Sequence, residues 1–426
     1  MIWLGIVVLI VAAVCGAPLF AVLMGAAMLG FLSADIDLAI VSIELYRIVD
    51  TPLLVALPLF TFAGYMLSEA RTSQRLVGLA QSLFGWMPSG LAVVAFGVCA
   101  IFTALTGASG VTIVALGALL FPSLVNSGFS ERFRLGLVTT SGSLGLLLVP
   151  SVPLILYAVV VQQMELEETF TVVDLFLAGL IPFSLMFGLL IGWTLWHHRG
   201  GKIPRIPFTW PAVGKALVAA RWELPLPVVV LGGIYSGYFA ISEAAAVTAL
   251  YVVIAETLLY RDVPWRKLPQ VMVRSMVMVG GILLILGVAF AFANFMVDAE
   301  VPQALFDFMQ RHIESQLAFL LLLNIVLLML GAVLDIFSAL VIMVPLILPV
   351  AIGYGVHPVH LGIVFLANMQ IGYFTPPVGM NLFISSYRFK KPLLEVYLAC
   401  WPFMVVLLVA LALITYVPWL SLVLVD

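Results

Sequence analysis

The chain has 426 residues, of which 64% are hydrophobic and only 9% are charged, and its mean hydropathy is +1.23. Soluble globular domains carry about a quarter charged residues, so this composition excludes an ordinary soluble protein. The net charge of −3 gives no general attraction to nucleic acid. Apolar runs of roughly 20 residues can cross a hydrocarbon core of about 30 Å. The sequence therefore predicts an all-α protein that crosses the membrane many times, in contact with lipid.

The residues that most often bind transition metals show no ligand spacing. Cys15, Cys99 and Cys400 are scattered in apolar surroundings, and the five histidines lie at span ends or in short connections. Isolated cysteines of this kind behave as small buried hydrophobes. We expect neither a transition-metal site nor an organic cofactor.

The apolar segments, taken in chain order, predict ten to twelve crossings. The first, "MIWLGIVVLIVAAVCGAPLF", has no basic n-region and continues past Pro18, so we interpret it as a retained first span rather than a cleaved signal peptide. Two later segments are too long for one crossing and contain small, polar breaks, "TALTGASG" and "GAVLDIFS". Each predicts a re-entrant hairpin or two helices with a tight turn. The segments are 2–32, 52–68, 89–125, 135–161, 173–196, 224–260, 271–297, 317–350, 360–386 and 393–424.

Two polar stretches separate these segments. Residues 197–215 are basic and rich in Pro and Gly, which predicts a cytoplasmic loop between two halves. Residues 297–316 have apolar side chains at helical spacing among charges, which predicts an amphipathic helix at the membrane interface. We divide the chain into scaffold helices 1–88, a first transport repeat 89–198, a loop and scaffold helices 199–297, a second transport repeat 298–392 and a C-terminal helix 393–426.

An internal repeat relates two of the apolar segments. A shift of 226 positions places "GLVTTSGSLGLLLVPSVPLILY" (136–157) on "GIVFLANMQIGYFTPPVGMNLF" (362–383), with Gly136 on Gly362 and Pro150 on Pro376. The first copy is followed by acidic "QQMELEE" (162–168) and the second by basic "YRFKKP" (387–392). Cytoplasmic loops are enriched in Lys and Arg, so the two copies are predicted to have opposite orientations. Inverted repeats of this kind are common in secondary transporters.

The prolines inside the repeat interrupt the helices and leave backbone groups free to bind ligands. A proline frees backbone carbonyls of their helical partners, and in a membrane such a break persists only inside protein or beside a water-filled cavity. Freed carbonyls with Ser or Thr hydroxyls can bind a desolvated cation, and the next helix start presents N–H groups to an anion. A simple proline kink is the alternative for each break taken alone. Two repeat-related breaks with Gly and Ser or Thr favour a binding site.

At these residues the sequence resembles the large membrane subunit of tripartite ATP-independent periplasmic (TRAP) transporters. The similar stretches are "ALTGASGVTIVALGALLFPSLVNSGFSERFRLGLVTTSGSLGLLLVPSVPLILY" (104–157), "GGIYSGYFAISEAAAVTALYVVI" (232–254) and residues 330–386 with "GYFTPPVGMNLF". The resemblance covers essentially the whole chain. It implies a sodium-driven permease of the bacterial inner membrane with two re-entrant hairpins, two broken helices and an elevator-type transport domain. It also implies a small four-helix membrane subunit, a periplasmic substrate-binding protein and an organic anion such as a carboxylate as substrate.

Two cation sites and one anion site are expected. The first sodium site is assigned to Ser109, with Thr106 and Thr112 as second choices, and to carbonyls at Gly145, Leu148 and Pro150. The second is assigned to Thr375 and Asp335, with carbonyls at Gly331, Gly372 and Val378. Asp335 can bind the cation or cap the following helix. The anion is expected at Ser109, Gly110 and Asn381, with Arg47 as a more distant carboxylate contact, whereas Glu243 is expected to cap or pack a scaffold helix. The family often has a further hydroxyl where this chain has Ala108 and a second proline where it has Ser151, which leaves the number of hydroxyl ligands in the first site open.

Two other classes of protein compete with this interpretation. A stand-alone symporter or anion exporter without a binding protein would have the same breaks. An intramembrane enzyme would need a nucleophile and base, such as Ser and His or paired aspartates, at membrane depth. No histidine lies in the middle of a span, and only Asp335 offers a carboxylate in a hairpin. We expect no enzyme activity. Neither the particular anion, the sodium stoichiometry nor the oligomeric state follows from the sequence.

Overall fold

The computed structural model of the chain describes residues 2–49, 51–164, 170–199 and 207–425. These ranges consist of helices, turns and short connections. Most of the acidic stretch after the first repeat and part of the predicted basic loop lie outside the described residues. The predicted all-α class is confirmed.

The helices named in the following sections have these bounds. The first half contains α1 (Ile2–Val14), α2 (Leu19–Ser33), α3 (Ala39–Val49), α4 (Ala56–Glu69), α5 (Thr72–Phe84), α6 (Gly90–Thr106), α7 (Ser109–Asn126), α8 (Glu131–Ser141), α9 (Val152–Gln162) and α10 (Val172–His197). The second half contains α11 (Trp210–Ala219), α12 (Pro225–Tyr235), α13 (Ile241–Ile254), α14 (Leu268–Asp298), α15 (Val301–His312), α16 (Gln316–Val333), α17 (Ile336–Gly353), α18 (Pro358–Gly372), α19 (Met380–Phe389), α20 (Leu393–Tyr416) and α21 (Trp419–Leu422). Shorter helical pieces are the 3₁₀ turns Pro52–Val55, Leu144–Leu147 and Trp265–Lys267 and the π turn Ala255–Leu259.

The N-terminal segment differs from the single span predicted for it. It folds into two short helices, α1 and α2, joined by a turn in which Gly16 has φ +83°. Gly5 approaches Leu29, and Gly25 approaches Leu9, so the two helices run antiparallel. At about 1.5 Å per residue neither helix covers the hydrocarbon thickness. The physical reason is the Gly16–Pro18 turn, because Gly16 takes the left-handed conformation that ends α1, and α2 starts directly after Pro18.

The count of spans is also lower than predicted. Among the described residues, eight helices are long and apolar enough to cross a membrane, or nine if Glu131–Leu147 and Val152–Gln162, bent by 42° at their junction, are one span. Several apolar segments that the sequence suggested as crossings are shorter helices, among them α1, α2, α6, α12 and α18. The structure is therefore that of a multi-span membrane protein with broken helices.

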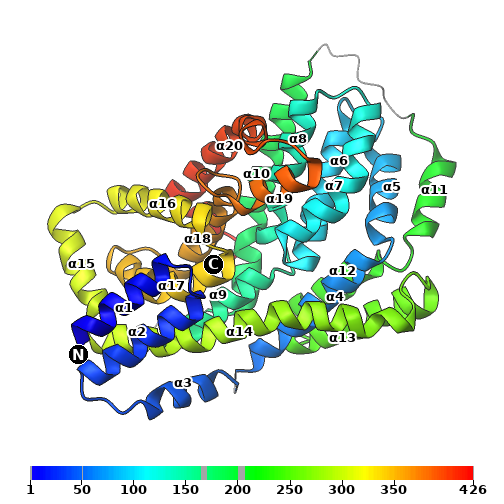
Figure 1. The fold of residues 1–426 in the computed structure, drawn as a ribbon. Helices are drawn as coiled ribbons and strands as arrows, with labels where there is room; N and C mark the ends of the chain where they lie inside the picture. Colours follow the sequence, from blue (N-terminus) through cyan, green and yellow to red (C-terminus); the bar gives the residue numbers. More distant parts are fainter. Residues whose placement is uncertain (1, 50, 165–169, 200–206, 426) are drawn as a thin grey trace.

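Two helical hairpins and two breaks dominate the architecture. Hairpin 1 is α6, a tip at 107–108, and α7; hairpin 2 is α16, a tip at 334–335, and α17. The first break, residues 142–151, lies between α8 and α9, and the second break, residues 373–379, lies between α18 and α19. The two hairpins come from different ends of the molecule, with α9 and α18 between them (Figure 1).

The repeat is real, but its register differs by one residue from the predicted shift. Ile336 follows Ser109 by 227 positions and Gly353 follows Asn126 by the same number, so α7 and α17 are equivalent from start to end. In this register the two breaks align Gly145 with Gly372. The identities that suggested 226 are few, and Pro150 can be aligned with either Pro376 or Pro377, so the proline match does not determine the register.

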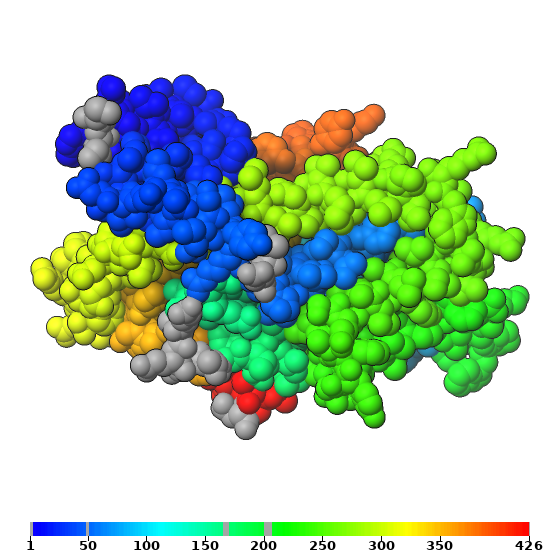
Figure 2. Space-filling view, turned by 90° about the horizontal axis from the view of Figure 1, so that it is seen from below, coloured from blue at the N-terminus to red at the C-terminus, as the bar shows by residue number. Residues whose placement is uncertain are grey.

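The remaining helices form a second group around α14. Helices α2, α3 and α4 pack against α14, and α13 packs against α4. Figure 2 shows α1–α3, in blue, gathered at one end of the molecule. Gly64 of α4 approaches hairpin 1 so closely that a methyl there would lie 2.5 Å from the Leu105 carbonyl oxygen. Helix α14 contacts α17, so this second group meets both hairpins.

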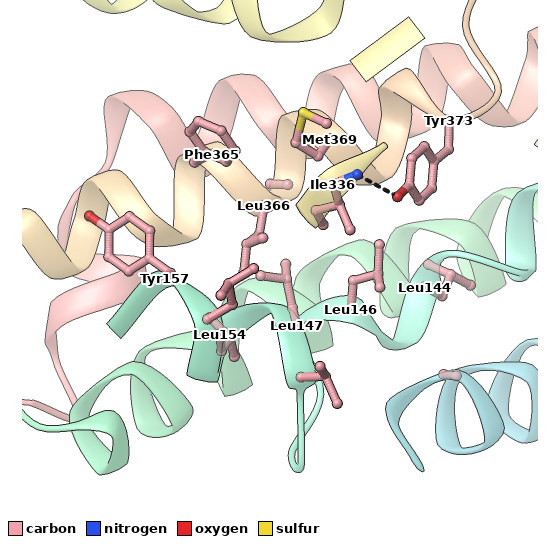
Figure 3. Packing of buried hydrophobic residues seen from close by; sticks show 14 of the residues in the cluster. Leu144, Leu146, Leu147, Leu154, Tyr157, Ile336, Phe365, Leu366, Met369 and Tyr373 are labelled. Atoms are coloured by element: carbon pink, nitrogen blue, oxygen red, sulfur yellow. Dashed lines mark hydrogen bonds between the residues drawn. The ribbon is translucent and has the colours of Figure 1, made fainter. Parts of the chain in front are cut away.

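Apolar side chains of the first break fill the core between the repeats. Leu144, Leu146 and Leu147 are almost fully buried and face α18, where Phe365 and Leu366 are also buried (Figure 3). The hydroxyl of Tyr157 donates to the Pro358 carbonyl at 2.6 Å and so joins α9 to the start of α18. The break is therefore enclosed by protein, as a freed backbone in a membrane requires.

Two local predictions can be compared directly with the structure. The amphipathic segment forms α15, whose Phe306 packs against Gly353 and Tyr354 at the end of α17. The Glu243 carboxylate accepts from the Ala240 backbone N–H at 2.9 Å at the start of α13. Capping by Glu243 is thus confirmed.

Candidate functional site

The two hairpin tips meet at one cavity. Its volume is about 820 Å³, and both tips, the second break and α14 contribute to its wall. Ser109, Gly110 and Asp335, three of the predicted site residues, line it. The other lining residues are Ser68, Gly107, Ala108, Val111, Val114, Ala115, Met278, Gly281, Ile282, Ile285, Phe337, Tyr373, Met380 and Ile384. The fold therefore brings residues more than 200 positions apart to one space.

The start of α7 presents uncapped backbone donors to this cavity. Gly107 ends α6 with φ +66°, a conformation that favours glycine, and turns the chain at the tip. The residue before α7 is Ala108, which has no side-chain acceptor, and the structure describes no side-chain cap there. The first N–H groups of a helix lack partners within the helix, and the dipole makes this end positive. This end is suited to an anion.

The backbone N–H groups at the start of α17 already have side-chain acceptors. The Asp335 carboxylate accepts from the backbone N–H groups of Phe337 and Ser338, both at 3.0 Å. The hydroxyl of Ser338 donates to the same carboxylate. The N–H of Ile336 donates to the Tyr373 hydroxyl at 2.8 Å (Figure 3). The capping role weighed for Asp335 is thus confirmed, and the donors at this tip are already used.

The second break lies directly against the tip of hairpin 2. A methyl placed on Gly372 would lie 2.6 Å from the Gly331 Cα atom, so the two backbones touch. The Thr375 hydroxyl donates to the Ile371 carbonyl at 2.8 Å, which leaves its lone pairs as the groups that could bind a cation. Gly331 and Gly372 are therefore in contact, and Thr375 follows Gly372 within the same turn. Of the residues predicted for the second cation site, Asp335 lines the cavity, whereas Gly331, Gly372, Thr375 and Val378 do not.

The first break packs in the equivalent way against the end of α6. A methyl on Gly145 would lie 2.0 Å from the Ala100 carbonyl oxygen. The Gly145 carbonyl accepts from Leu148 N at 3.1 Å, and the Gly372 carbonyl accepts from Thr375 N at 2.9 Å, so the repeats share this turn. Leu148 and Pro150 lie in the break but do not line the cavity.

Threonines surround the first break. Thr106 is fully buried at the end of α6. Thr112 and Thr103 lie with their hydroxyl oxygens 2.7 Å apart, and the Thr103 hydroxyl donates to the Gly142 carbonyl at 2.8 Å. Thr103 was missed in the sequence. In the sequence Thr103 is marked only by its position nine residues before Thr112. This spacing does not predict that the two side chains meet across the tip of hairpin 1.

A side-chain hydrogen bond joins the two repeats. The Ser109 hydroxyl donates to the Asn381 amide oxygen at 2.8 Å. Asn381 is fully buried and does not line the cavity, whereas Ser109 lines it and is 4% exposed. The two predicted anion contacts are thus neighbours, with Ser109 in front and Asn381 behind it.

Arg47 lies elsewhere. It lines a separate cavity of about 340 Å³ with Gln163, Asn294 and Pro345, among others. Both cavities border α14, the first at Met278 to Ile285 and the second at Phe290 to Val297. The structure thus separates Arg47 from the space between the tips.

The electrostatics of the cavity between the tips are unusual for an anion site. Among the described residues, its lining includes a carboxylate, Asp335, and no Lys, Arg or His side chain. Positive potential there comes from the start of α7 and from any cation held beside the breaks. In the part of the chain described, no group of three His, Cys, Asp or Glu residues could hold a metal ion.

Two re-entrant hairpins, two broken helices and a cavity lined by both hairpin tips define a membrane transporter of the secondary type. The family model described as "Tripartite ATP-independent periplasmic transporter, DctM component" matches residues 4–420. The chain belongs to this family and is a large permease subunit of a TRAP transporter. The resemblance noted in the sequence is confirmed.

Named relatives support the same conclusion. The chain is 35% identical over 407 residues to the C4-dicarboxylate TRAP transporter large permease protein DctM of Rhodobacter capsulatus, covering 92% of this chain and 91% of the relative. It is 34% identical to the protein of the same name from Pseudomonas aeruginosa, covering 89% and 88%. It is 26% identical to the ectoine/5-hydroxyectoine TRAP transporter large permease protein UehC of Ruegeria pomeroyi, covering 98% and 97%.

One solved structure shows the same fold. The Alcanivorax borkumensis YdaH transporter, described as having an unusual topology, superposes with a TM-score of 0.58 over 87% of this chain and 84% of its own. The sequences are 14% identical, so the likeness concerns the fold alone.

Proposed function

We propose that this chain is the large membrane subunit of a sodium-coupled secondary transporter that imports an organic anion into bacteria across the inner membrane. A periplasmic binding protein delivers the anion, and a small membrane subunit accompanies the chain, as in other TRAP systems. The two hairpins and two broken helices move together past the α14 group in an elevator motion. Relatives named for C4-dicarboxylates make this class of anion the first to test.

One observation carries this proposal. The cavity between the tips offers an anion the uncapped start of α7 but no cationic side chain, and it contains the Asp335 carboxylate. An anion brought there without a counter-charge would face repulsion from Asp335 and the loss of its hydration. Cations at the two breaks would supply the missing charge. This requirement supports coupling to a cation, for which we propose sodium.

The cation sites of the proposal are the two equivalent turns. The first is formed by the carbonyls of the turn at Gly145 and Leu148 with nearby hydroxyls. The second is formed by the turn at Gly372 and Thr375 beside Gly331, with Asp335 near it. The anion binds in front, at Ser109 and Gly110.

Reconstitution tests this function. The chain is placed in proteoliposomes with its small membrane subunit and the candidate binding protein, and uptake of radiolabelled succinate is measured with an inward sodium gradient or with choline in its place. We expect uptake only with sodium and binding protein together. Equal uptake without the binding protein would support a stand-alone symporter instead. Uptake that is indifferent to sodium contradicts the coupling.

A further inference from the structure

The second break is connected to both hairpin tips, and this is not a property of the first break. Residues 373–379 and the start of α19 make hydrogen bonds to α16, α17 and α7. The first break bonds to hairpin 1, where the Thr103 hydroxyl donates to the Gly142 carbonyl at 2.8 Å, and to α18, where the Ser143 hydroxyl donates to the Gln370 carbonyl at 3.0 Å. Among the described residues it makes no hydrogen bond to hairpin 2. The Ser151 hydroxyl donates to the nearby Leu146 carbonyl. The two repeats therefore differ in how they are joined to the rest of the site.

The contacts to hairpin 2 use groups that a helix end leaves unpaired. Ile336 is the first residue of α17, and its N–H donates to the Tyr373 hydroxyl at 2.8 Å. Ala332 lies at the end of α16, and its carbonyl accepts from Gly379 N at 2.8 Å. Helix starts lack acceptors for their N–H groups and helix ends lack donors for their carbonyls. The second break thus supplies hydrogen-bond partners to the end of α16 and to the start of α17.

The contact to hairpin 1 starts from the same residues. The Asn381 backbone N–H donates to the Tyr373 carbonyl at 2.9 Å. The Asn381 side chain then accepts from Ser109, the first residue of α7, at 2.8 Å. Its amide nitrogen contacts the Thr139 carbonyl at 3.4 Å. A continuous path of hydrogen bonds therefore runs from Ile336 through Tyr373 and Asn381 to Ser109.

All members of this path are almost fully buried, and Ser109 and Tyr373 also line the cavity between the tips. Tyr373 and Ser109 are each 4% exposed, Ile336 is 1% exposed and Asn381 is fully buried. Hydrogen bonds are stronger in such surroundings, and an unpaired group there is costly. The path is therefore a rigid link between the first residues of α7 and α17, and its loop is also one wall of the predicted second cation site.

We propose that Tyr373 and Asn381 are positioning residues that make the two tips respond together when a cation binds at the second break. This inference rests on the proposed function. A cation at Gly372 and Thr375 orders the loop that carries Tyr373. Tyr373 then fixes the start of α17, and Asn381 fixes Ser109 at the start of α7, where the anion binds. The cation and the anion are thus coupled although they bind to different tips.

The test measures both tips separately. The complex with its small membrane subunit is placed in lipid nanodiscs, and backbone hydrogen exchange of residues 107–112 and 335–340 is followed at increasing NaCl, with choline chloride holding the ionic strength. In the unmodified protein we expect both tips to become protected at the same sodium concentration. The midpoint of each tip is the sodium concentration at which its protection is half-maximal. In Tyr373→Phe and in Asn381→Ala we expect the midpoints of the two tips to differ by about threefold to tenfold, the factor that corresponds to one neutral hydrogen bond.

The matched control is Tyr157→Phe. It makes the same chemical change at a buried tyrosine whose hydroxyl donates to Pro358, away from both tips. Its two midpoints should stay together. Tyr373→Phe preserves the ring and its packing, which keeps the test meaningful if Asn381→Ala misfolds.

The outcomes are distinct. Coincident midpoints in both Tyr373→Phe and Asn381→Ala overturn the positioning role. Absence of any sodium effect at either tip in the unmodified protein instead contradicts the proposed sodium coupling. A double-mutant cycle on uptake adds a second readout, because Ser109→Ala and Asn381→Ala should be far from additive if Asn381 acts through Ser109.

Discussion

Gly372 and Gly331 meet backbone to backbone, so that a methyl group on Gly372 would lie 2.6 Å from the Gly331 Cα atom and 2.7 Å from its carbonyl carbon. This contact places the second break against the tip of hairpin 2. Real Cβ atoms do not approach backbone this closely, and neither backbone can move aside as a flexible side chain would.

Gly372→Ala is therefore expected to force hairpin 2 away from the break. Overpacking of this kind costs about 1–3 kcal/mol, and transport should be lost even if the protein still inserts. Thermal unfolding in detergent and uptake in proteoliposomes measure the two effects. Gly188→Ala in α10 is the control, since nothing lies within 4 Å of its added methyl. Equal behaviour of the two variants would contradict the contact.

Asp335 can be tested for its two possible roles with two substitutions. Asparagine caps a helix nearly as well as aspartate, but it carries no charge. Asp335→Asn should therefore fold normally and raise the sodium concentration for half-maximal uptake by about tenfold, the factor given by roughly 1.4 kcal/mol of lost attraction. Asp335→Ala should in addition destabilise the protein by about 1 kcal/mol. An unchanged sodium dependence of Asp335→Asn would leave capping as its whole role.

The hydroxyls of Ser109 and Thr375 are expected to contribute more to sodium binding than to the stability of the fold. Thr375 already donates its proton to Ile371, and Ser109 donates to Asn381, so each oxygen keeps lone pairs for a cation. Ser109→Ala and Thr375→Ala should each weaken sodium-dependent uptake several-fold. Thr375→Ser restores the oxygen and should recover most of the activity. If both alanine variants keep their sodium dependence, the site assignment is wrong.

The positions of the two cavities along α14 predict that their lining residues are accessible from opposite sides of the membrane. Met278 lines the cavity between the tips and Asn294 lines the one that contains Arg47, about 24 Å apart along a helix that rises 1.5 Å per residue. In a background without Cys15, Cys99 and Cys400, a membrane-impermeant thiol reagent should label Met278→Cys and Asn294→Cys from different sides. Sodium with substrate should change their labelling rates in opposite directions. Parallel changes at both positions would argue against alternating access.

An ion cluster is expected to stabilise the contacts of α5 with the segment before α12 and with the turn that follows α13. Arg75 forms ion pairs with Glu223, Glu256 and Asp262, at 3.1 Å to Glu256 and 2.6 Å to Asp262. Glu256 is 0% exposed. Arg75→Gln would leave three carboxylates without their cation, which typically costs about 3–5 kcal/mol. The free energy of unfolding in detergent checks this.

An exposed ion pair nearby is the comparison. Lys267 pairs with Glu69 at 3.2 Å, and its side chain is 55% exposed. Such pairs contribute about 0–1 kcal/mol, so Lys267→Gln should change stability little. A similar loss in both variants would mean that Arg75 does not hold the cluster together.

Much of the site could be predicted because its signals are local. Prolines with glycines in an apolar segment indicate a break wherever they occur, and small residues at "TGASG" and "GAVLD" indicate tips. Asp335 follows the same logic, since a carboxylate before an apolar helix is either a cap or a ligand. The repeat itself could be found, but its register was one residue off, because Pro150 can be aligned with either Pro376 or Pro377 and the other identities are few.

What failed depended on distant contacts. The first span became the α1–α2 hairpin because a turn at Gly16–Pro18 competes with helix continuation, and only packing against α14 and between the two helices decides the outcome. Tyr373 lies within "GYFTPPVG", but its role depends on Ile336, whose backbone N–H donates to the Tyr373 hydroxyl. Arg47 shared no local signal with the tips, and the structure places it at a different cavity.

The sequence by itself determined that this protein lies in a membrane, that its helices break at two related places and that an acid stands before the second hairpin arm. These follow from composition, from the missing N–H of proline and from the preferences of helix ends, all of which act within a few residues. Only the tertiary structure decided which tip keeps free donors and that Asn381 stands behind Ser109, because both depend on how residues hundreds of positions apart are packed.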